Sequence, residues 1–295
     1  MASSIPASAM GSSGRRTLHA QRELWRRFAR NRAALAGLAF AVLFTFVGLF
    51  APLVAPFTPL DLGDSFVPPS GEHRLGSDNL GGDVLSNIIY GARTSLIVGV
   101  FSVLTSTLIG ATIGALSGFF AGPADRILMR LTDMVLVLPQ FFLAIVIIAI
   151  FGSGLWSIIA VIGLLNWPGT ARLLRAEFLA LRKREYVEAA RALGTSNFDL
   201  IVREILPNAL PPIIVNSTLQ ISGAILLEAS LSFLGLGDPT VMSWGVMLHN
   251  AQDSFHRAWW VALFPGLALF LTTLGLNLMG DGLNDALNPR MRGPT

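Results

Sequence analysis

Long apolar runs alternate with short polar stretches along the whole chain. A helix crosses the hydrocarbon of a bilayer with about 20 mostly apolar residues, and lipid offers no partner to an unpaired backbone amide. The pattern therefore predicts an all-α integral membrane protein. Six runs qualify as transmembrane helices, at residues 33–56, 94–120, 127–151, 155–173, 211–236 and 259–280.

The fourth run is the weakest of the six. Its sequence NWPGT places Pro168 and Gly169 inside the apolar stretch. Proline lacks a backbone N–H and clashes with the preceding turn, and glycine lowers helix stability further. We expect the fourth helix to break or bend there.

Basic residues are distributed unequally between the two sides that six crossings create. Of the 21 lysines and arginines, 18 lie on one side, and only Arg74, Arg93 and Arg257 lie on the other. Cytoplasmic segments of membrane proteins carry the excess of Lys and Arg. Both chain ends are therefore predicted to be cytoplasmic, and the first run is too long for a cleaved signal peptide.

This topology divides the chain into a tail and a membrane domain. Residues 1–32 are expected to be a basic cytoplasmic tail, in which arginines and Leu24, Trp25 and Phe28 form an amphipathic helix at the membrane surface. The six-span domain covers 33–290, and a short tail follows at 291–295. Its expected connections are an external segment at 57–93, a cytoplasmic loop at 174–210 and a second external loop at 237–258.

The cytoplasmic loop has the pattern of two short helices around a turn. Residues 184–193 are good helix formers, and Gly194 is typical of a helix C-terminus. Ser196 and Asp199 suggest a capping box that starts a second helix, which Pro207 would end.

That second helix is predicted to have an apolar face. Phe198, Ile201, Val202 and Ile205 recur at helical spacing. Such a face can pack on the ends of the chain's own spans, or it can enter a groove of another protein. The pattern alone leaves both interpretations open.

Several motifs together resemble one family of membrane proteins. The segments EAARALG, from Glu188 to Gly194, and ILP, from Ile205 to Pro207, closely resemble the cytoplasmic EAA loop of ABC importer permeases. Four further segments look like the C-type permease of dipeptide, oligopeptide and nickel importers, so the resemblance covers roughly residues 30–290. They are HRLGSDNLGGDVLSNIIYGARTSL from His73, LLEASLSFLGLGDP from Leu226, SWGVML from Ser243 and NLMGDGLNDALNPR from Asn277.

The resemblance implies a type I ABC importer permease of the bacterial inner membrane. Its loop would dock into a cleft of a cytoplasmic ATPase through Glu188, Ala189, Ala190 and Gly194, with Leu206 and Pro207 completing the motif. The implied partners are a second permease, two ATPase subunits and an external substrate-binding protein, with no nucleic acid. ATP and Mg would bind to the ATPases, and this chain would bind no cofactor. Peptides are the expected substrate, and nickel is the alternative.

The chain departs from the family pattern at three positions. Glu204 stands where an apolar residue or histidine is usual. Gly82 replaces the arginine of the external motif, and Asn288 replaces an aspartate.

Enzyme and carrier functions have little support in the sequence. The only lysine, Lys183, follows no glycine-rich loop, so a P-loop is absent. GLGD at 235–238 lacks the second aspartate motif of an intramembrane protease and is better explained as a turn, and the four histidines lack metalloprotease spacing. A gradient-driven carrier could draw only on Glu228 and the Pro168–Gly169 pair.

Three ionisable residues fall inside predicted spans, where charges are costly. Arg130 and Asp133 are expected to pair one turn apart, with the arginine reaching toward the membrane surface. Glu228 either lines the solute path or satisfies a group on a neighbouring helix.

Overall fold

The computed structural model describes residues 25, 26, 28–59 and 61–287. Leu24, Asn288 and the terminal tails, for which predictions from the sequence stand above, lie outside these ranges. The described residues are almost entirely helical, and the only extended pairings among them are two isolated bridges, Leu62 with Gly82 and Ser77 with Asp83.

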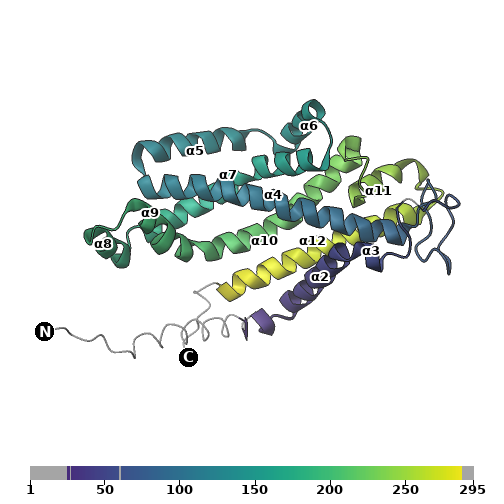
Figure 1. Cartoon of the computed structure of the whole chain (residues 1–295), viewed down its shortest axis with the longest axis horizontal. Helices are drawn as coiled ribbons and strands as arrows, with labels where there is room; N and C mark the ends of the chain where they lie inside the picture. Colours follow the sequence, from purple (N-terminus) through teal and green to yellow (C-terminus); the bar gives the residue numbers. More distant parts are fainter. Residues whose placement is uncertain (1–24, 27, 60, 288–295) are drawn as a thin grey trace.

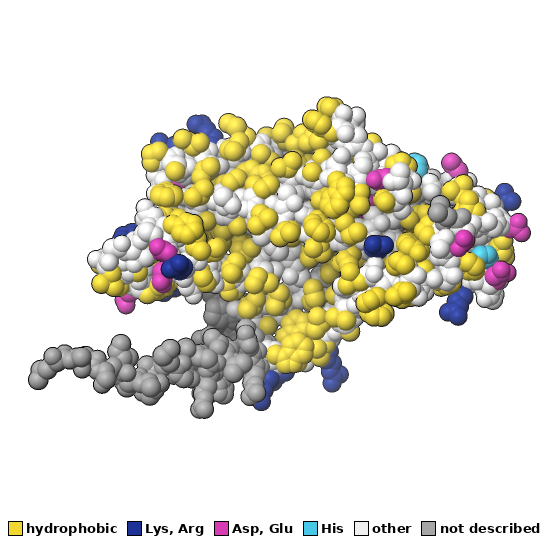
Figure 2. All heavy atoms as spheres, in the orientation of Figure 1, with side chains coloured by type: hydrophobic (Ala, Val, Ile, Leu, Met, Phe, Trp, Pro, Cys, Tyr) yellow, Lys and Arg dark blue, Asp and Glu magenta, His cyan; other side chains and the backbone are white. Residues whose placement is uncertain are grey.

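Five long helices run along the molecule (Figure 1). Each is long and apolar enough to cross a membrane, so the predicted all-helical membrane fold is confirmed. They are α2 (Arg32–Leu49), α4 (Val84–Phe120), α7 (Leu155–Leu181), α10 (Leu206–Leu231) and α12 (Trp259–Leu287). Hydrophobic side chains cover most of the middle of the visible face, and most charged side chains lie toward its two ends (Figure 2).

The third predicted span is a bent pair, and the expectation of one helix over 127–151 was wrong. Helices α5 (Gly122–Val137) and α6 (Gln140–Phe151) meet at 84°. Pro139 explains the bend, because proline pushes the preceding residue out of the helical region, and Leu138 is extended at φ −78° and ψ 131°. Counted as one, this pair is the sixth candidate span.

Helix α7 passes through Pro168 without the expected break. Its packing on α4 explains the continuity. A Cβ atom at Gly110 of α4 would lie 2.7 Å from the Trp167 carbonyl oxygen, and one at Gly114 would lie 2.5 Å from that of Ala171. Small residues allow two membrane helices to approach this closely, and such neighbours support a helix that contains proline.

Other helix bounds differ from the apolar runs because helices continue into polar sequence. Helix α4 begins at residue 84, ten residues before the predicted span, since the Asp83 carboxylate caps it by accepting from the Ser86 backbone N–H at 2.8 Å. Helices α7 and α12 continue to residues 181 and 287. The first span is shorter than predicted, because α2 stops at Leu49 and a short helix α3 (Ala51–Val54) follows.

The two ends of the bundle carry different connections, and we name them by these. The outer end holds residues 61–83 and α11 (Trp244–Asn250), and the inner end holds α8 (Glu185–Ala192) (Figure 1). At the outer end two buried indoles donate to backbone carbonyls, Trp244 to Ile88 at 3.0 Å and Trp260 to Ser77 at 3.1 Å. These bonds fasten the outer connections to the long helices.

Candidate functional site

The connection between α7 and α10 is the candidate functional site. It consists of α8, a turn, the short helix α9 (Asn197–Asp199) and the π-helical segment η2 (Leu200–Ile205), which leads directly into α10. Figure 1 shows α8 and α9 at one end of the bundle. Because α7 reaches residue 181 and α10 begins at residue 206, the connection is shorter than the predicted loop 174–210.

The turn after α8 depends on Gly194, as the sequence predicted. Gly194 has φ +83°, a left-handed conformation that glycine adopts without strain. The backbone N–H of Gly194 donates to the Arg191 carbonyl at 3.0 Å, and that of Thr195 donates to the Ala190 carbonyl at 3.2 Å. This pair of bonds is a Schellman motif, which satisfies the last carbonyls of a helix.

The second helix begins at Ser196, also as predicted. The Ser196 hydroxyl accepts from the backbone N–H of Asp199 at 3.2 Å and donates to the Asp199 carboxylate at 2.6 Å. The carboxylate therefore binds the cap hydroxyl, whereas a full capping box would use the cap backbone N–H.

The predicted apolar face of the second helix was only partly correct. Ile205 is fully buried, but Phe198 is 70% exposed and Val202 is 39% exposed. Leu200, which the pattern left out, is fully buried. The π-helix explains the change, since its i to i+5 bonding places residues 200 and 205 on the same side. Pro207 does not end the helix; it lies in the first turn of α10, where proline is tolerated.

The side of the loop that faces the helix bundle is part of the chain's own core. Val187, Leu200 and Ile205 are fully buried in one cluster with Phe119 of α4 and Phe178 of α7. Packing on the chain's own spans is thus confirmed for this side. Burying such side chains contributes roughly 1.5 to 3 kcal/mol each, so the loop is held firmly to three long helices.

Arginines add polar links between the loop and the ends of the helices, and no sequence pattern had predicted them. The guanidinium of Arg182 donates to the Phe119 carbonyl, in the last turn of α4, at 2.9 Å. That of Arg191 lies over the Phe119 ring, 5.8 Å from its centroid. A bidentate pair, Arg175 with Asp125 at 2.5 and 2.6 Å, joins α7 to α5. Each partner is distant in sequence, so no local pattern indicates these contacts.

On the side that faces away from the bundle, the loop leaves large apolar side chains exposed. We call Tyr186, Leu193, Phe198 and Val202 the exposed loop face; Leu193, the most accessible, is 87% exposed. The residues predicted to dock lie beside it: Glu188, Ala189 and Gly194 are exposed, and Ala190 is half-buried. Of the pair that completes the motif, Leu206 is half-buried and Pro207 is exposed.

The intramembrane ionisable residues lie apart from this loop. Asp133 pairs with Arg172 of α7 at 2.6 Å, so the expected pair with Arg130 was wrong; an interhelical partner competed successfully with the residue one turn away. Arg130 is exposed.

Glu228 lies inside the chain's own packing. It is 2% exposed, and its Oε1 accepts from the Ser232 hydroxyl at 2.7 Å, while Oε2 has no hydrogen-bond partner among the described residues. Its hydrogen bond from Ser232 is within its own helical segment, and the Ser243 side chain of the following loop also lies beside the carboxylate. Within the described ranges, no group of three or more His, Asp or Glu side chains could hold a metal ion.

Comparison with known proteins gives the family. Residues 110–293 match the family model of the binding-protein-dependent transport system inner membrane component, and residues 21–69 match the N-terminal transmembrane domain of oligopeptide transport permease C. The fold resembles that of a chain of the MetNI methionine ABC transporter, solved in inward-facing conformations. The TM-score is 0.56 at 18% identity, over 68% of this chain and 96% of that one.

Curated relatives match over nearly the whole chain. A di/tripeptide transport system permease protein of Pseudomonas aeruginosa is 45% identical over 92% of both chains. A glutathione transport system permease protein of Pectobacterium atrosepticum is 41% identical over 92% of this chain and 91% of that one. A dipeptide transport system permease protein of Alkalihalophilus pseudofirmus is 39% identical over 92% and 90%. The chain therefore belongs to the family of inner membrane components of binding-protein-dependent transport systems, as an ABC importer permease that crosses the bacterial inner membrane several times.

Proposed function

We propose that this chain is the permease subunit of a peptide importer and that its α7–α10 loop receives the movement of a cytoplasmic ATPase. Peptide as the substrate class is supported by relatives named for di/tripeptide, dipeptide and glutathione transport. The observation that carries the proposal is the two-sided loop. One side is fixed in the core, and the other presents apolar side chains and the EAA residues outward.

The outward residues suit docking into a groove. Ala189 and Ala190 are small, so a partner surface can approach the α8 backbone closely. Glu188 supplies a charge at the contact, and Gly194 makes the sharp turn. Leu193 and Phe198 would lose water on docking, and burial of such side chains drives protein association.

The inward residues suit transmission. A push on α8 is carried by Val187 into the cluster that holds Phe119 and Phe178. Interiors are close-packed and resist compression, so the inner ends of α4 and α7 have to move with the loop. Movement of these helices would open the solute path alternately to either side, with no covalent step on this chain.

The proposed assembly has further subunits. A second permease would complete the path, two ATPases would bind and hydrolyse ATP with Mg, and an external binding protein would deliver the peptide. This chain supplies the membrane passage and the loop.

Co-purification tests the docking function. The chain is co-expressed with the ATPases and sister permease of its operon, as wild type, Gly194→Asp and Glu188→Arg. A matched charge reversal, Asp253→Arg, changes an exposed residue of the outer end. We expect the ATPases to be lost from the two loop variants while the permease pair survives and the control stays complete. Retention of ATPases and full transport in both loop variants would contradict the proposal.

A further inference from the structure

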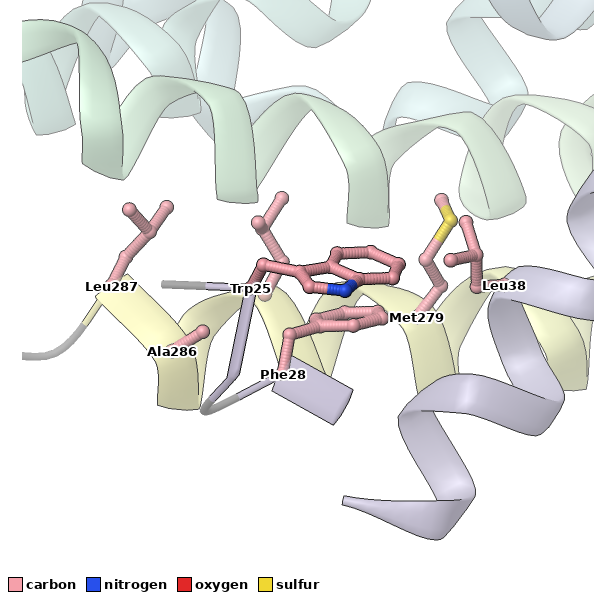
Figure 3. A pocket seen from close by; sticks show the side chains of 7 residues that line it. Trp25, Phe28, Leu38, Met279, Ala286 and Leu287 are labelled. Atoms are coloured by element: carbon pink, nitrogen blue, oxygen red, sulfur yellow. The ribbon is translucent and has the colours of Figure 1, made fainter. Parts of the chain in front are cut away.

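An apolar groove lies beside the inner end of α12. Its volume is about 350 Å³, and it is formed by Trp25 and Phe28, which precede α2, and by Met279, Leu283 and Leu287 of α12. Figure 3 shows the Trp25 and Phe28 rings one above the other, between the α12 side chains Met279 and Leu287. The ring centroids are 6.0 Å apart, with an angle of 18° between the planes.

The groove lies at the membrane surface. Helix α12 starts at the outer end, where Trp260 binds Ser77, and runs toward the inner end, so its last two turns lie on the inner half of the molecule but short of α8 (Figure 1). Trp25 is 57% exposed, and Phe28 is 8% exposed. A half-exposed tryptophan in this position is typical of the boundary between hydrocarbon and headgroups.

A close contact of α2 with α12 borders the groove. A Cβ atom at Gly37 would lie 2.6 Å from the Gly275 carbonyl oxygen, and one at Gly282 would lie 2.1 Å from the Ala34 Cβ atom. The two helices are already as close as their backbones allow. Phe28 packs on Ala34 and Ala286, so it is fixed as one wall.

Positive charge accompanies the groove. Arg26, Arg30 and Arg32 flank its two aromatic residues in sequence, and all three are exposed. None of them forms an ion pair with another described residue. The two carboxylates of this part of α12, Asp281 and Asp285, are each two positions from Leu283. At 3.6 residues per turn, both lie on the face of α12 opposite Leu283. By the same spacing Arg26 and Arg30, each two positions from Phe28, lie away from its ring, so their long side chains reach the membrane surface and not the inside of the groove.

We propose that this groove binds an anionic phospholipid, with one acyl chain along Met279, Leu283 and Leu287 and the headgroup phosphate at Arg26 and Arg30. An apolar lining takes the hydrocarbon chain, and guanidinium groups bind phosphate in bidentate fashion. A phospholipid is the one abundant membrane component that combines both chemistries at this depth. The proposal does not depend on which solute the protein transports.

Lipid retention tests the proposal. The full-length chain, co-purified with its partner subunits, is placed in bilayer discs of phosphatidylglycerol and phosphatidylcholine, and lipids that stay bound are counted by native mass spectrometry. Two variants each change one half of the site. The double substitution Arg26→Gln with Arg30→Gln removes the headgroup contacts, and Leu283→Trp fills the apolar lining. Matched controls are Arg257→Gln at the outer end and Leu267→Trp, at a residue of α12 that is 45% exposed.

We expect the wild type and both controls to retain one phosphatidylglycerol more than either variant. Loss of two arginines should weaken that site about 30-fold. Equal retention of phosphatidylglycerol and phosphatidylcholine by the wild type would overturn the proposal. So would unchanged retention in Leu283→Trp, which would mean that residues 1–24 or another subunit fills the groove. If Leu283→Trp lost the bound phosphatidylglycerol but the double arginine variant kept it, the headgroup contact with Arg26 and Arg30 would be wrong.

Discussion

The outer connections and the inner loop are fastened to the same long helices by different chemistry. At the outer end, buried indoles and carboxylates bind backbone groups: Trp260 donates to Ser77, and Asp83 caps α4. At the inner end, apolar side chains of the loop enter the core, while Leu193 and Phe198 stay exposed. Buried hydrogen bonds require fixed geometry, whereas an apolar cluster with an apolar outer side can both transmit a movement and bind a second surface. The comparison indicates where this chain is built to remain fixed and where it is built to contact a partner.

The largest expected effect is at the outer end. Trp244→Ala removes a fully buried indole and its bond to the Ile88 carbonyl. We expect a loss of about 3 to 5 kcal/mol of stability, measured as a lower unfolding temperature in detergent. ATPase association of the molecules that remain folded should be unchanged. If the ATPases were lost from folded Trp244→Ala protein, the two ends would not be independent.

An intermediate effect is expected at the loop turn. Gly194→Ala meets no atom within 4 Å but forces a side chain into the left-handed region, at a cost of about 1 to 2 kcal/mol. Residues 185–205 should then open about 5- to 30-fold more often in hydrogen exchange. Gly194→Asn is the matched control, since asparagine tolerates this conformation. Equal exchange in both variants would show that the turn does not set the loop's stability.

At the exposed loop face, a substitution should change docking to the ATPase without changing the stability of the loop. Phe198→Ser should change stability by no more than about 0.5 kcal/mol, because the side chain is 70% exposed, and yet reduce ATPase association. Leu200→Ser, two residues away and fully buried, should instead destabilise the loop in hydrogen exchange. A destabilised Phe198→Ser loop would mean that this face packs within the chain.

The smallest effect concerns acid at the outer end. Partial burial raises the pKa of Asp238, but hydrogen bonds from Thr240 and from the Leu155 backbone N–H outweigh it and hold the pKa below its usual value. A lowered folded-state pKa stabilises the protein above about pH 4 and loses that contribution as the pH falls through the folded value. Asp238→Asn should therefore lower stability at pH 7 and flatten its acid dependence below pH 4. An unaltered acid profile would remove Asp238 as the group responsible.

The sequence predicted those features that depend on local chemistry. Apolar runs predicted the membrane helices, Gly194 predicted the turn, and Ser196 predicted the helix start. Pro139 carried a local signal for the bend before α6, and it was overlooked.

Features that depend on tertiary packing were not predictable. Helix α7 continues through Pro168 because glycines of α4 support it. The π-helix buries Leu200 and so changes which residues form the apolar face. Asp133 of α5 forms its ion pair with Arg172 of α7, a different helix. For Pro168 and Asp133 the deciding neighbour is distant in sequence, so no spacing within one segment reveals it, and the π-helix changes the very spacing on which the predicted face was based.

Cross-linking tests most directly whether the loop contacts an ATPase. The chain has no cysteine, so a single introduced thiol gives an unambiguous site. Ala189→Cys lies on the exposed side of α8, and Phe255→Cys, at a residue 55% exposed at the outer end, is the control. In assembled transporter in membranes, a short cross-linker that is thiol-reactive at one end and photoreactive at the other should join position 189, and not position 255, to an ATPase subunit, with a yield that changes on addition of ATP. No ATPase adduct at position 189, with or without ATP, in a transporter that still hydrolyses ATP and transports would contradict the account.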